Sequence, residues 1–594
     1  MSDANANQRS KNQRSEIFLM PGDSLHINSA GVEQNTYDAI VIGSGISGGW
    51  AAKELCEHGL KTLVLERGRD VKHIKDYPTA NLAPWEFRHH GQMILKDQKE
   101  NPVASKCYAF DETAAHFFVK DKEHPYVQEK PFDWIRGYQV GGKSLTWGRC
   151  TQRWSDFEFT GPQRFGYGWD WPIRYADVAP WYSHVEKFIG VCGNKDGLEA
   201  MPDGEFLPPF ELNCVEQHLK ESILKNYGNR HLVHARWAHL TQPNQIHLDQ
   251  GRGQCQARNL CQRGCPFGGY FSSNSSTLPW AAKTGNLTVR PFSVVHSINY
   301  DEQKQKATGV KVIDAETKKA TEFFARIIFV NGSALNSNLI LLNSTSNRFP
   351  NGLGNDSGVL GKYVCFHNYR GFMIGQIDGF EDKYYYGRNP TDAIIANYRN
   401  LHKQDTDFLG GYTTYVSARR GRDDGETCPQ QIGATYKEAM TEPGPWQVYS
   451  YIQGETIPKE TNHVRLSTDQ KDEWGIPLLV TSVDYDDNDE KLLKDFFVQT
   501  EEMLTKAGVK NIYHRDSKQA PGLDIHEMGG CRMGTDPGTS MLDNRNALHH
   551  CKNVFVTDGA CMASTGNQSP SILYMTLTAR AANHAVDELK KGNL

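Results

Sequence analysis

The 594-residue sequence lacks long apolar runs, an excess of charge of either sign, and a dense set of cysteines. No stretch approaches the roughly 18 consecutive apolar residues that suggest a membrane span. Lysine and arginine number 65 against 70 acidic residues, which gives a net charge of −5. No basic surface for nucleic acid or an anionic membrane is therefore expected. We predict neither nucleic-acid binding nor a direct membrane span.

A secretory leader is also missing from the first residues. The segment MSDANANQRSKNQRSEIF is polar and has no apolar h-region. Residues 1–35 are predicted to form a flexible N-terminal segment. With no export signal of its own, the chain is expected in the cytoplasm.

What the chain does have is the composition of a large globular protein. Hydrophobic residues make up 38% of it, and there are 54 glycines, which together fall in the usual globular range. At roughly 150 residues per domain, the length allows two to four domains. The 13 cysteines are an odd number, and a disulfide framework is a poor explanation for a chain with a core of its own.

The first organised segment follows a strand, turn, helix and strand pattern. Residues 37–42 (YDAIVI) form an apolar, β-branched run that is typical of a buried parallel strand. They lead into the glycine-rich turn 43–48 and then into apolar residues at helical spacing that end at Gly59. A second strand is predicted at 62–65, and Glu66 follows it. This order is typical of a dinucleotide-binding unit.

Each glycine of the turn has its own expected role. Gly43 permits the tight turn, Gly45 lets the backbone approach a pyrophosphate, and Gly48 allows close packing of helix on strand. The helix N-terminus offers free N–H groups to the phosphates, and Glu66 can accept hydrogen bonds from a ribose. The alternative is an ordinary turn that binds no nucleotide. The turn alone does not distinguish NAD from FAD.

Three further motifs lie far from this turn: VGGKSLTWG at 140–148, HEMGGCRMG at 526–534 and DGACMASTGNQSPS at 558–571. Together with the N-terminal turn, they resemble the glucose-methanol-choline (GMC) oxidoreductase family, which binds FAD. The resemblance implies FAD as the cofactor. An NAD-dependent dehydrogenase would leave the C-terminal motifs unexplained.

The resemblance implies an α/β architecture, in which a Rossmann-like FAD-binding domain is interleaved with a sheet-based substrate domain. The FAD-binding domain is expected from residues 36–160, 250–345 and 515–594, and the substrate domain from 346–514. Residues 161–249 are expected to be a connecting region that leads into a cluster of cysteines. Strand-like runs separated by polar turns late in the substrate segment agree with this division.

The same resemblance implies which residues contact FAD. They belong to the N-terminal turn, the acid and base after the second strand, the second glycine-rich motif, the segment after NLTVRP and the C-terminal motif: Gly43, Gly45, Gly48, Glu66, Arg67, Gly141, Gly142, Ser144, Val295, Asp558 and Gly559. In the related pyranose 2-oxidase, a histidine of the second motif binds FAD covalently, and Thr146 occupies that position here. A hydroxyl group cannot form the histidyl linkage, so we predict non-covalent FAD.

For catalysis, the resemblance implies that His526 and Asn567 face the flavin. Oxidation of an alcohol requires removal of the hydroxyl proton while a hydride leaves the same carbon for flavin N5. A neutral imidazole titrates near the working pH and can take this proton, whereas an amide can only hold the substrate oxygen in place. The HEMGG segment lacks the second histidine of a zinc-protease motif, so zinc hydrolysis is not indicated.

Three cysteines, Cys255, Cys261 and Cys265, lie within eleven residues. Their spacing resembles the iron–sulfur branch of the family, and the surrounding segment is most similar to its glucoside 3-dehydrogenases. Gln254 departs from the pattern, because the bacterial glucose enzyme has a further cysteine there. Three thiolates suit a 3Fe–4S cluster. The alternatives are a structural zinc with a fourth ligand such as His247, or a loop of free thiols.

The resemblance implies oxidation of a sugar CH–OH group, with C3 of glucose, a glucoside or a disaccharide as the expected position. A cluster passes electrons singly, which implies a cytochrome-type acceptor and a small subunit as partners. A signal-bearing small subunit would place the complex in the periplasm. Two alternatives stay open: a pyranose-type oxidase that uses O₂ without a cluster, and a non-catalytic flavin-binding subunit.

Overall fold

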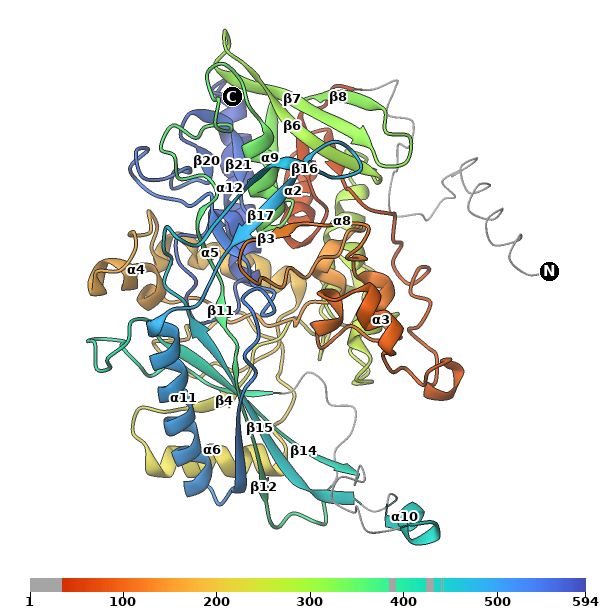
Figure 1. Cartoon of the computed structure of the whole chain (residues 1–594), viewed down its shortest axis with the longest axis vertical. Coiled ribbons are helices and arrows are strands. Elements are labelled where there is room, and N and C mark those ends of the chain that lie inside the picture. The colour runs from red at the N-terminus through yellow and green to blue at the C-terminus, as the bar shows by residue number, and fades with distance from the viewer. Residues whose placement is uncertain (1–34, 384–391, 423–431, 440, 442) are drawn as a thin grey trace, which may run out of the picture.

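The computed structural model of the protein describes residues 35–383, 392–422, 432–439, 441 and 443–594. Two sheet-containing regions occupy opposite ends of the long axis, called here the upper and the lower region as they appear in Figure 1. The N-terminal segment expected to be flexible lies outside the described residues, apart from Asn35.

The upper region is built on a six-stranded sheet. In sheet order its strands are β20 (Ala547–Leu548), β21 (Cys551–Val556), β9 (Ile327–Val330), β1 (Ala39–Ile42), β2 (Thr62–Leu65) and β5 (Leu287–Arg290). All neighbours are parallel except β20 and β21. Alternate residues of β1 belong to two different hydrophobic clusters, one on each face, so the strand is buried on both sides.

Two long helices cover this sheet. Helix α2 (Ile46–Glu57) follows the glycine turn after β1, and the C-terminal helix α12 (Ser571–Lys590) packs against it. A strand followed directly by a glycine turn and a buried helix is the predicted dinucleotide-binding unit. The mixed helix and sheet architecture of the sequence analysis is confirmed.

The lower region is built on a seven-stranded antiparallel sheet. Its strands are β18 (Lys510–Asp516), β12 (Gly371–Ile377), β15 (Pro443–Glu455), β14 (Tyr412–Arg422), β13 (Ala393–Ile395) and β4 (Leu232–His234) in sheet order, with β11 (His367–Asn368) paired to β15. Helices α6 (Cys214–Asn226) and α11 (Asp487–Lys506) pack on one face. Since side chains alternate along a strand, Tyr412 and Ile452 lie beneath these helices, whereas Tyr415 and Tyr451 face a cavity.

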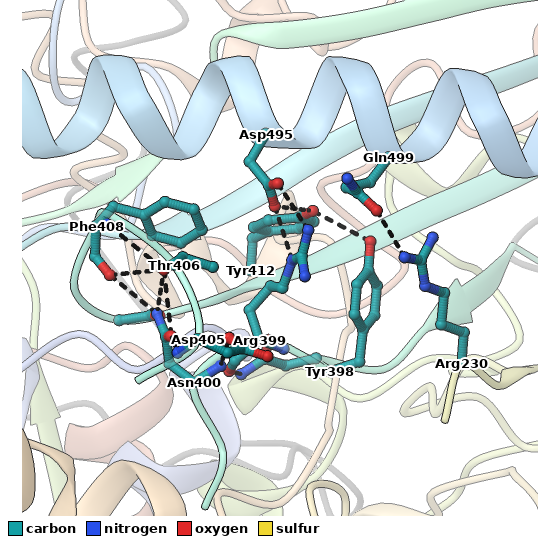
Figure 2. Close-up of polar contacts among 12 residues, drawn as sticks. Arg230, Tyr398, Arg399, Asn400, Asp405, Thr406, Phe408, Tyr412, Asp495 and Gln499 are labelled. Atoms are coloured by element: carbon teal, nitrogen blue, oxygen red, sulfur yellow. Dashed lines mark hydrogen bonds and ion pairs between the residues drawn. The ribbon is translucent and has the colours of Figure 1, made fainter. Parts of the chain in front are cut away.

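A polar network fastens α11 to this sheet (Figure 2). On α11, Asp495 accepts hydrogen bonds from the Arg399 guanidinium at 2.7 and 2.9 Å and from the Tyr412 hydroxyl at 2.8 Å. Further along the helix, Gln499 accepts a hydrogen bond from Arg230 at 2.6 Å. The network fixes α11 on the face of the sheet that points away from the cavity.

Two smaller sheets complete the architecture. The five-stranded sheet has the order β19 (Met528–Gly530), β10 (Lys362–Cys365), β16 (His463–Lys471), β17 (Pro477–Ser482) and β3 (Val127–Gln128). The three-stranded sheet consists of β6 (Ser293–Asp301), β7 (Lys306–Asp314) and β8 (Ala320–Phe324). The five-stranded sheet combines strands from 36–160, 346–514 and 515–594, so the two expected domains share it.

The segment 161–249 contributes to both regions. Its helix α5 (Tyr175–Ile189) packs against α12, whereas β4 belongs to the lower sheet and α6 packs on that sheet. The remaining α-helices are α3 (Leu95–Glu100), α4 (Asp156–Phe165), α7 (Gln245–Asp249), α8 (Thr277–Ala282), α9 (Ala334–Asn343) and α10 (Ala434–Ala439). Within the described ranges, no helix has both the length and the apolar character to cross a bilayer.

Candidate active site

A cavity of about 430 Å³ lies between the six-stranded and the seven-stranded sheets. Its wall includes the glycine turn after β1 at one end and tyrosines of β14 and β15 at the other. Segments that are hundreds of residues apart in the sequence therefore meet around one space.

The glycine turn has the geometry that its three expected roles require. Gly43 has a φ of +93°, and a Cβ on it would lie 2.3 Å from the carbonyl oxygen of Asn331. A Cβ on Gly48 would lie 2.0 Å from the carbonyl oxygen of Gly43, so α2 packs closely on the turn. A Cβ placed on Gly45, which lines the cavity, would have no atom within 4 Å among the described residues beyond its own stretch of backbone. The backbone at the start of α2 is thus open to a phosphate.

Glu66 lies at the carboxyl end of β2 and lines the cavity. Its carboxylate accepts hydrogen bonds from the Ser44 hydroxyl at 2.5 Å and from the Gly68 N–H at 3.0 Å. Burial raises the pKa of Glu66. The Ser44 hydroxyl also accepts a hydrogen bond from the Gly141 N–H at 2.9 Å. The first and second glycine motifs are therefore joined in one wall.

The other residues expected to contact FAD fall into two groups. Those that line the cavity are Arg67, Gly142, Ser144, Val295, Asp558 and Gly559. Gly48 and Gly141 are not part of its lining, and neither is Thr146, the position of the histidyl linkage in pyranose 2-oxidase. Gly141 has a φ of +91°, and a Cβ there would clash with the side chain of Asn274. This glycine therefore supports the cavity wall without lining the cavity.

His526 lines the cavity just before β19. Its Nδ1 lies 2.9 Å from Nδ1 of His367, and Nε2 of His367 lies 3.0 Å from the carbonyl oxygen of Gly566. One nitrogen of each ring and a carboxylate oxygen of Asp524 lie within 4.8 Å of one another. Burial lowers the pKa of His526 well below its ordinary value and that of His367 to about 4. Both rings are therefore neutral at neutral pH.

Asn567 lies behind the wall. Its amide oxygen accepts a hydrogen bond from the Thr413 hydroxyl at 2.7 Å, and its amide nitrogen donates to the Glu158 carboxylate at 3.0 Å. Gln453, which lines the cavity, donates to the backbone carbonyl of Asn567 at 3.0 Å and accepts from the Ser569 hydroxyl at 3.2 Å. The C-terminal motif that contains Asn567 thus adjoins the cavity. The side chains that line the cavity there are those of Gln453 and Ser569.

Several residues of the site were missed by the sequence reasoning. The rings of Tyr415 and Tyr451 stack with their centroids 4.7 Å apart, and Tyr369 meets Tyr451 edge-on at 5.0 Å. All three line the cavity. The alternation of WQVYSYIQG could have placed Tyr451 and Gln453 on one face, but no local pattern distinguishes His367.

The three cysteines lie on the loop between α7 and α8 at half-buried positions. The sulfur of Cys265 accepts a hydrogen bond from a backbone N–H of the same loop at 3.3 Å. Burial raises the pKa of Cys255 to about 11 and also raises that of Cys261. Gln262, next to Cys261 in the chain, and Arg149 line the cavity. The cysteine loop therefore adjoins the cavity.

The geometry does not favour a single zinc ion on this loop. In His247, Nδ1 accepts a hydrogen bond from the Asn244 N–H at 2.9 Å, and Nε2 lies 3.1 Å from the Lys187 carbonyl. Both ring nitrogens are thus engaged. Among the described residues, the three thiols do not all lie within 4.8 Å of one another, whereas tetrahedral zinc holds its sulfurs about 4 Å apart.

Comparison with known proteins identifies the family. Two family models described as GMC oxidoreductase match residues 37–367 and 458–578. The chain belongs to the GMC oxidoreductase family. The resemblance noted in the sequence is confirmed, and FAD is the cofactor that the family and the open glycine turn together indicate.

Relatives of this GMC oxidoreductase match along almost the whole chain. Paromamine 6'-oxidase of Streptomyces fradiae is 26% identical, over 94% of this chain and 92% of its own length. The fructose dehydrogenase large subunit of Gluconobacter japonicus is 24% identical, over 93% and 98%. A solved structure of formate oxidase from Aspergillus oryzae RIB40 has a TM-score of 0.58 at 13% identity and covers 94% of this chain and 100% of that chain. The overall fold is therefore shared with formate oxidase.

Proposed function

We propose that the protein oxidises a sugar CH–OH group to a keto group, at C3 of glucose, a glucoside or a disaccharide. One observation carries the proposal: a neutral, half-buried imidazole, His526, lines the same cavity as the glycine turn expected to bind FAD. The sugar class is supported by relatives whose names refer to paromamine, fructose and gluconate.

FAD, held in this cavity, would supply a hydride acceptor for the oxidation. The glycine turn and Glu66 would hold the adenosine and pyrophosphate of FAD. His526 takes the hydroxyl proton, because burial lowers its pKa and keeps the ring unprotonated at neutral pH. Gln453 and Ser569 would hold the sugar oxygen, and Asn567 positions Gln453 through its backbone carbonyl.

The lower end of the cavity suits a carbohydrate. Tyr369, Tyr415 and Tyr451 offer aromatic surface for the apolar face of a sugar ring, and Asp392 offers a carboxylate at the same end. Pockets that combine aromatic side chains with a few placed polar groups are typical of small-molecule sites.

We further propose that Cys255, Cys261 and Cys265 hold a 3Fe–4S cluster, which would supply single-electron transfer to a cytochrome-type acceptor. The loop's position beside the cavity supports this proposal. A small subunit is proposed as a partner, because two relatives are named as a large subunit and a flavoprotein. Co-export with a signal-bearing subunit would place the complex in the periplasm, and otherwise it would work in the cytoplasm.

An oxidase that passes electrons to O₂ is the second candidate function. Two relatives are named as oxidases, paromamine 6'-oxidase and the 6'''-hydroxyparomomycin C oxidase of Streptomyces lividus, which is 25% identical. An oxidase of this kind requires no iron–sulfur cluster. It predicts hydrogen peroxide in step with sugar oxidation and no bound iron.

An anaerobic visible spectrum of the purified protein, before and after addition of methyl glucoside, tests the proposal. Flavin bands over a broad iron–sulfur background, with bleaching of the flavin on addition, are the expected result. A clean flavin spectrum that bleaches would favour the oxidase. Flavin that does not bleach with any sugar or alcohol would leave a non-catalytic flavin-binding subunit.

A further inference from the structure

A second histidine lies directly behind His526 in a chain of three hydrogen-bonding groups. His367 is fully buried, and its ring meets that of His526 edge-on, at 5.0 Å between centroids and an angle of 83°. One nitrogen of His367 contacts the Gly566 carbonyl and the other contacts Nδ1 of His526. The ring thus bridges the proposed base and the backbone of the C-terminal motif.

The direction of each hydrogen bond follows from what its groups can donate. A carbonyl oxygen can only accept, so Nε2 of His367 carries a proton and donates to Gly566. A neutral imidazole has one N–H, so Nδ1 of His367 is an acceptor. At 2.9 Å, Nδ1 of His526 must then supply the proton of their hydrogen bond. The proton of a neutral His526 is therefore on Nδ1.

We propose that His367 is a positioning residue that fixes the tautomer of His526, with the proton on Nδ1 and the lone pair on Nε2. The other tautomer would set two nitrogen lone pairs against each other. Among the described residues, the hydrogen bond found for the His526 ring is the one at Nδ1, and the side chain lines the cavity, so Nε2 is the nitrogen left for the substrate. This inference rests on His526 as the base of the proposed function, and it adds which nitrogen takes the substrate proton.

His367 is itself held by both regions of the molecule. It lies on β11, which pairs with β15 of the lower sheet, and its backbone N–H donates to the Asp524 carboxylate at 2.8 Å. The charged groups around the two rings are Asp524 and the ion pair of Lys143 with Glu527 at 2.9 Å. None of them accepts a hydrogen bond from Nδ1 of His526, so the assignment depends on His367.

A matched pair of variants separates this role from a structural one. In His367→Asn the amide reaches the place of Nδ1 and can accept from His526, but it cannot reach Gly566. In His367→Gln the amide reaches the place of Nε2 and can donate to Gly566, but it leaves Nδ1 of His526 without an acceptor. The readout is the rate of flavin reduction by sugar in anaerobic stopped flow, with FAD content and thermal unfolding measured for both variants.

We expect His367→Gln to lower the rate on the order of 10²–10⁴-fold, because the wrong tautomer of His526 leaves the substrate without its general base. His367→Asn, which keeps an acceptor for Nδ1 of His526, should lose much less of the rate. The pH profile of His367→Gln should also move, because its His526 is no longer held in one tautomer. Equal rates, or a faster Gln variant, would show that the bond to Gly566 is what matters and would overturn the proposal.

A second measurement needs no substrate. Nitrogen NMR spectra of protein labelled with ¹⁵N-histidine distinguish protonated from unprotonated ring nitrogens, and His526→Gln assigns the signals of His526. An unprotonated Nε2 in the wild type, converted to a protonated one in His367→Gln, is the expected result. A proton on Nε2 in the wild type overturns the inference. If no sugar bleaches the flavin but Nε2 is unprotonated, the proposed function fails while the role of His367 stands.

Discussion

Single residues of one short motif have different tasks at this site. The identities of Gly43, Gly45 and Gly48 and their roles follow from spacing alone, because each role depends on local backbone geometry. The role of His367 does not follow in this way, because its partners His526 and Gly566 are distant in the chain and only the fold brings them together. The side-chain contacts of Asn567 with Thr413 and Glu158 could not be predicted from local sequence patterns for the same reason.

Removal of the proposed base gives the first prediction at this scale. His526→Ala should lower the rate of flavin reduction by sugar on the order of 10²–10⁴-fold, because one positioned base is lost. FAD should stay bound, since the glycine turn is untouched. Stopped-flow reduction measures the effect, and His402→Ala, at a largely exposed histidine, serves as the control. Reduction at the wild-type rate would remove His526 from the role of base.

The attachment of FAD gives a second prediction. Thr146 has no imidazole with which to form a histidyl linkage, and it does not line the cavity. Precipitation with acid should therefore release the yellow colour into the supernatant and leave a colourless pellet. Colour that stays with the polypeptide would contradict non-covalent binding.

At the scale of elements, the strands β14 and β15 show how one segment serves two purposes. The period of two places Tyr412 and Ile452 under the helices, and Tyr415 and Tyr451 in the wall of the cavity. Such strands and the helix α11 were predictable, because alternation and helical periodicity are local signals. Which strand pairs with which was not, since pairing across the seven-stranded sheet joins segments as distant as β4 and β13.

Helix α11 begins with a buried acid whose charge opposes folding. Asp489 accepts a hydrogen bond from the Asp486 N–H at 2.9 Å, and burial raises its pKa from 3.8 to about 8. The folded state therefore keeps a proton that the unfolded chain releases, and stability is lost as the pH rises from about 4 to about 8.

Asp489→Asn should remove this loss of stability at high pH. Its amide oxygen can still accept the hydrogen bond from the Asp486 N–H, and the amide carries no charge. Urea unfolding should show the variant to be more stable than the wild type by roughly 1–3 kcal/mol near pH 9, with little difference near pH 4. Asp487→Asn, on the same first turn of the helix, is the comparison variant. An equal gain in the free energy of unfolding at pH 4 and pH 9 would show that the charge of Asp489 is not the cause.

At the scale of the whole molecule, the cavity depends on segments from both ends of the chain. The family resemblance implies interleaved domains, whereas composition and periodicity carry no information on which distant segments meet. The same holds for the cysteine loop. The spacing of its cysteines was visible in the sequence, but the position of its Gln262 in the cavity wall, together with Arg149, is a property of the fold.

The combined variant Cys255→Ser, Cys261→Ser and Cys265→Ser tests the proposed electron route. Iron should fall to background by metal analysis, because serine does not replace thiolate as a ligand for a 3Fe–4S cluster. Sugar should still bleach the flavin, while reduction of a one-electron acceptor such as cytochrome c should be largely lost. Cys214→Ser, on α6, is the control. An unchanged rate with cytochrome c would show that electrons leave by another path.

Strand β21 pairs with β9, and β9 pairs with β1, in the six-stranded sheet. The strand that begins the flavin-binding unit is therefore two places away from a strand that the ribosome makes much later. A nascent chain that has only the glycine turn lacks Asp558 and Gly559, so it has no complete cavity wall for FAD. FAD should therefore bind only after β21 and the residues that follow it have been made, and termination anywhere before residue 551 should yield a colourless protein.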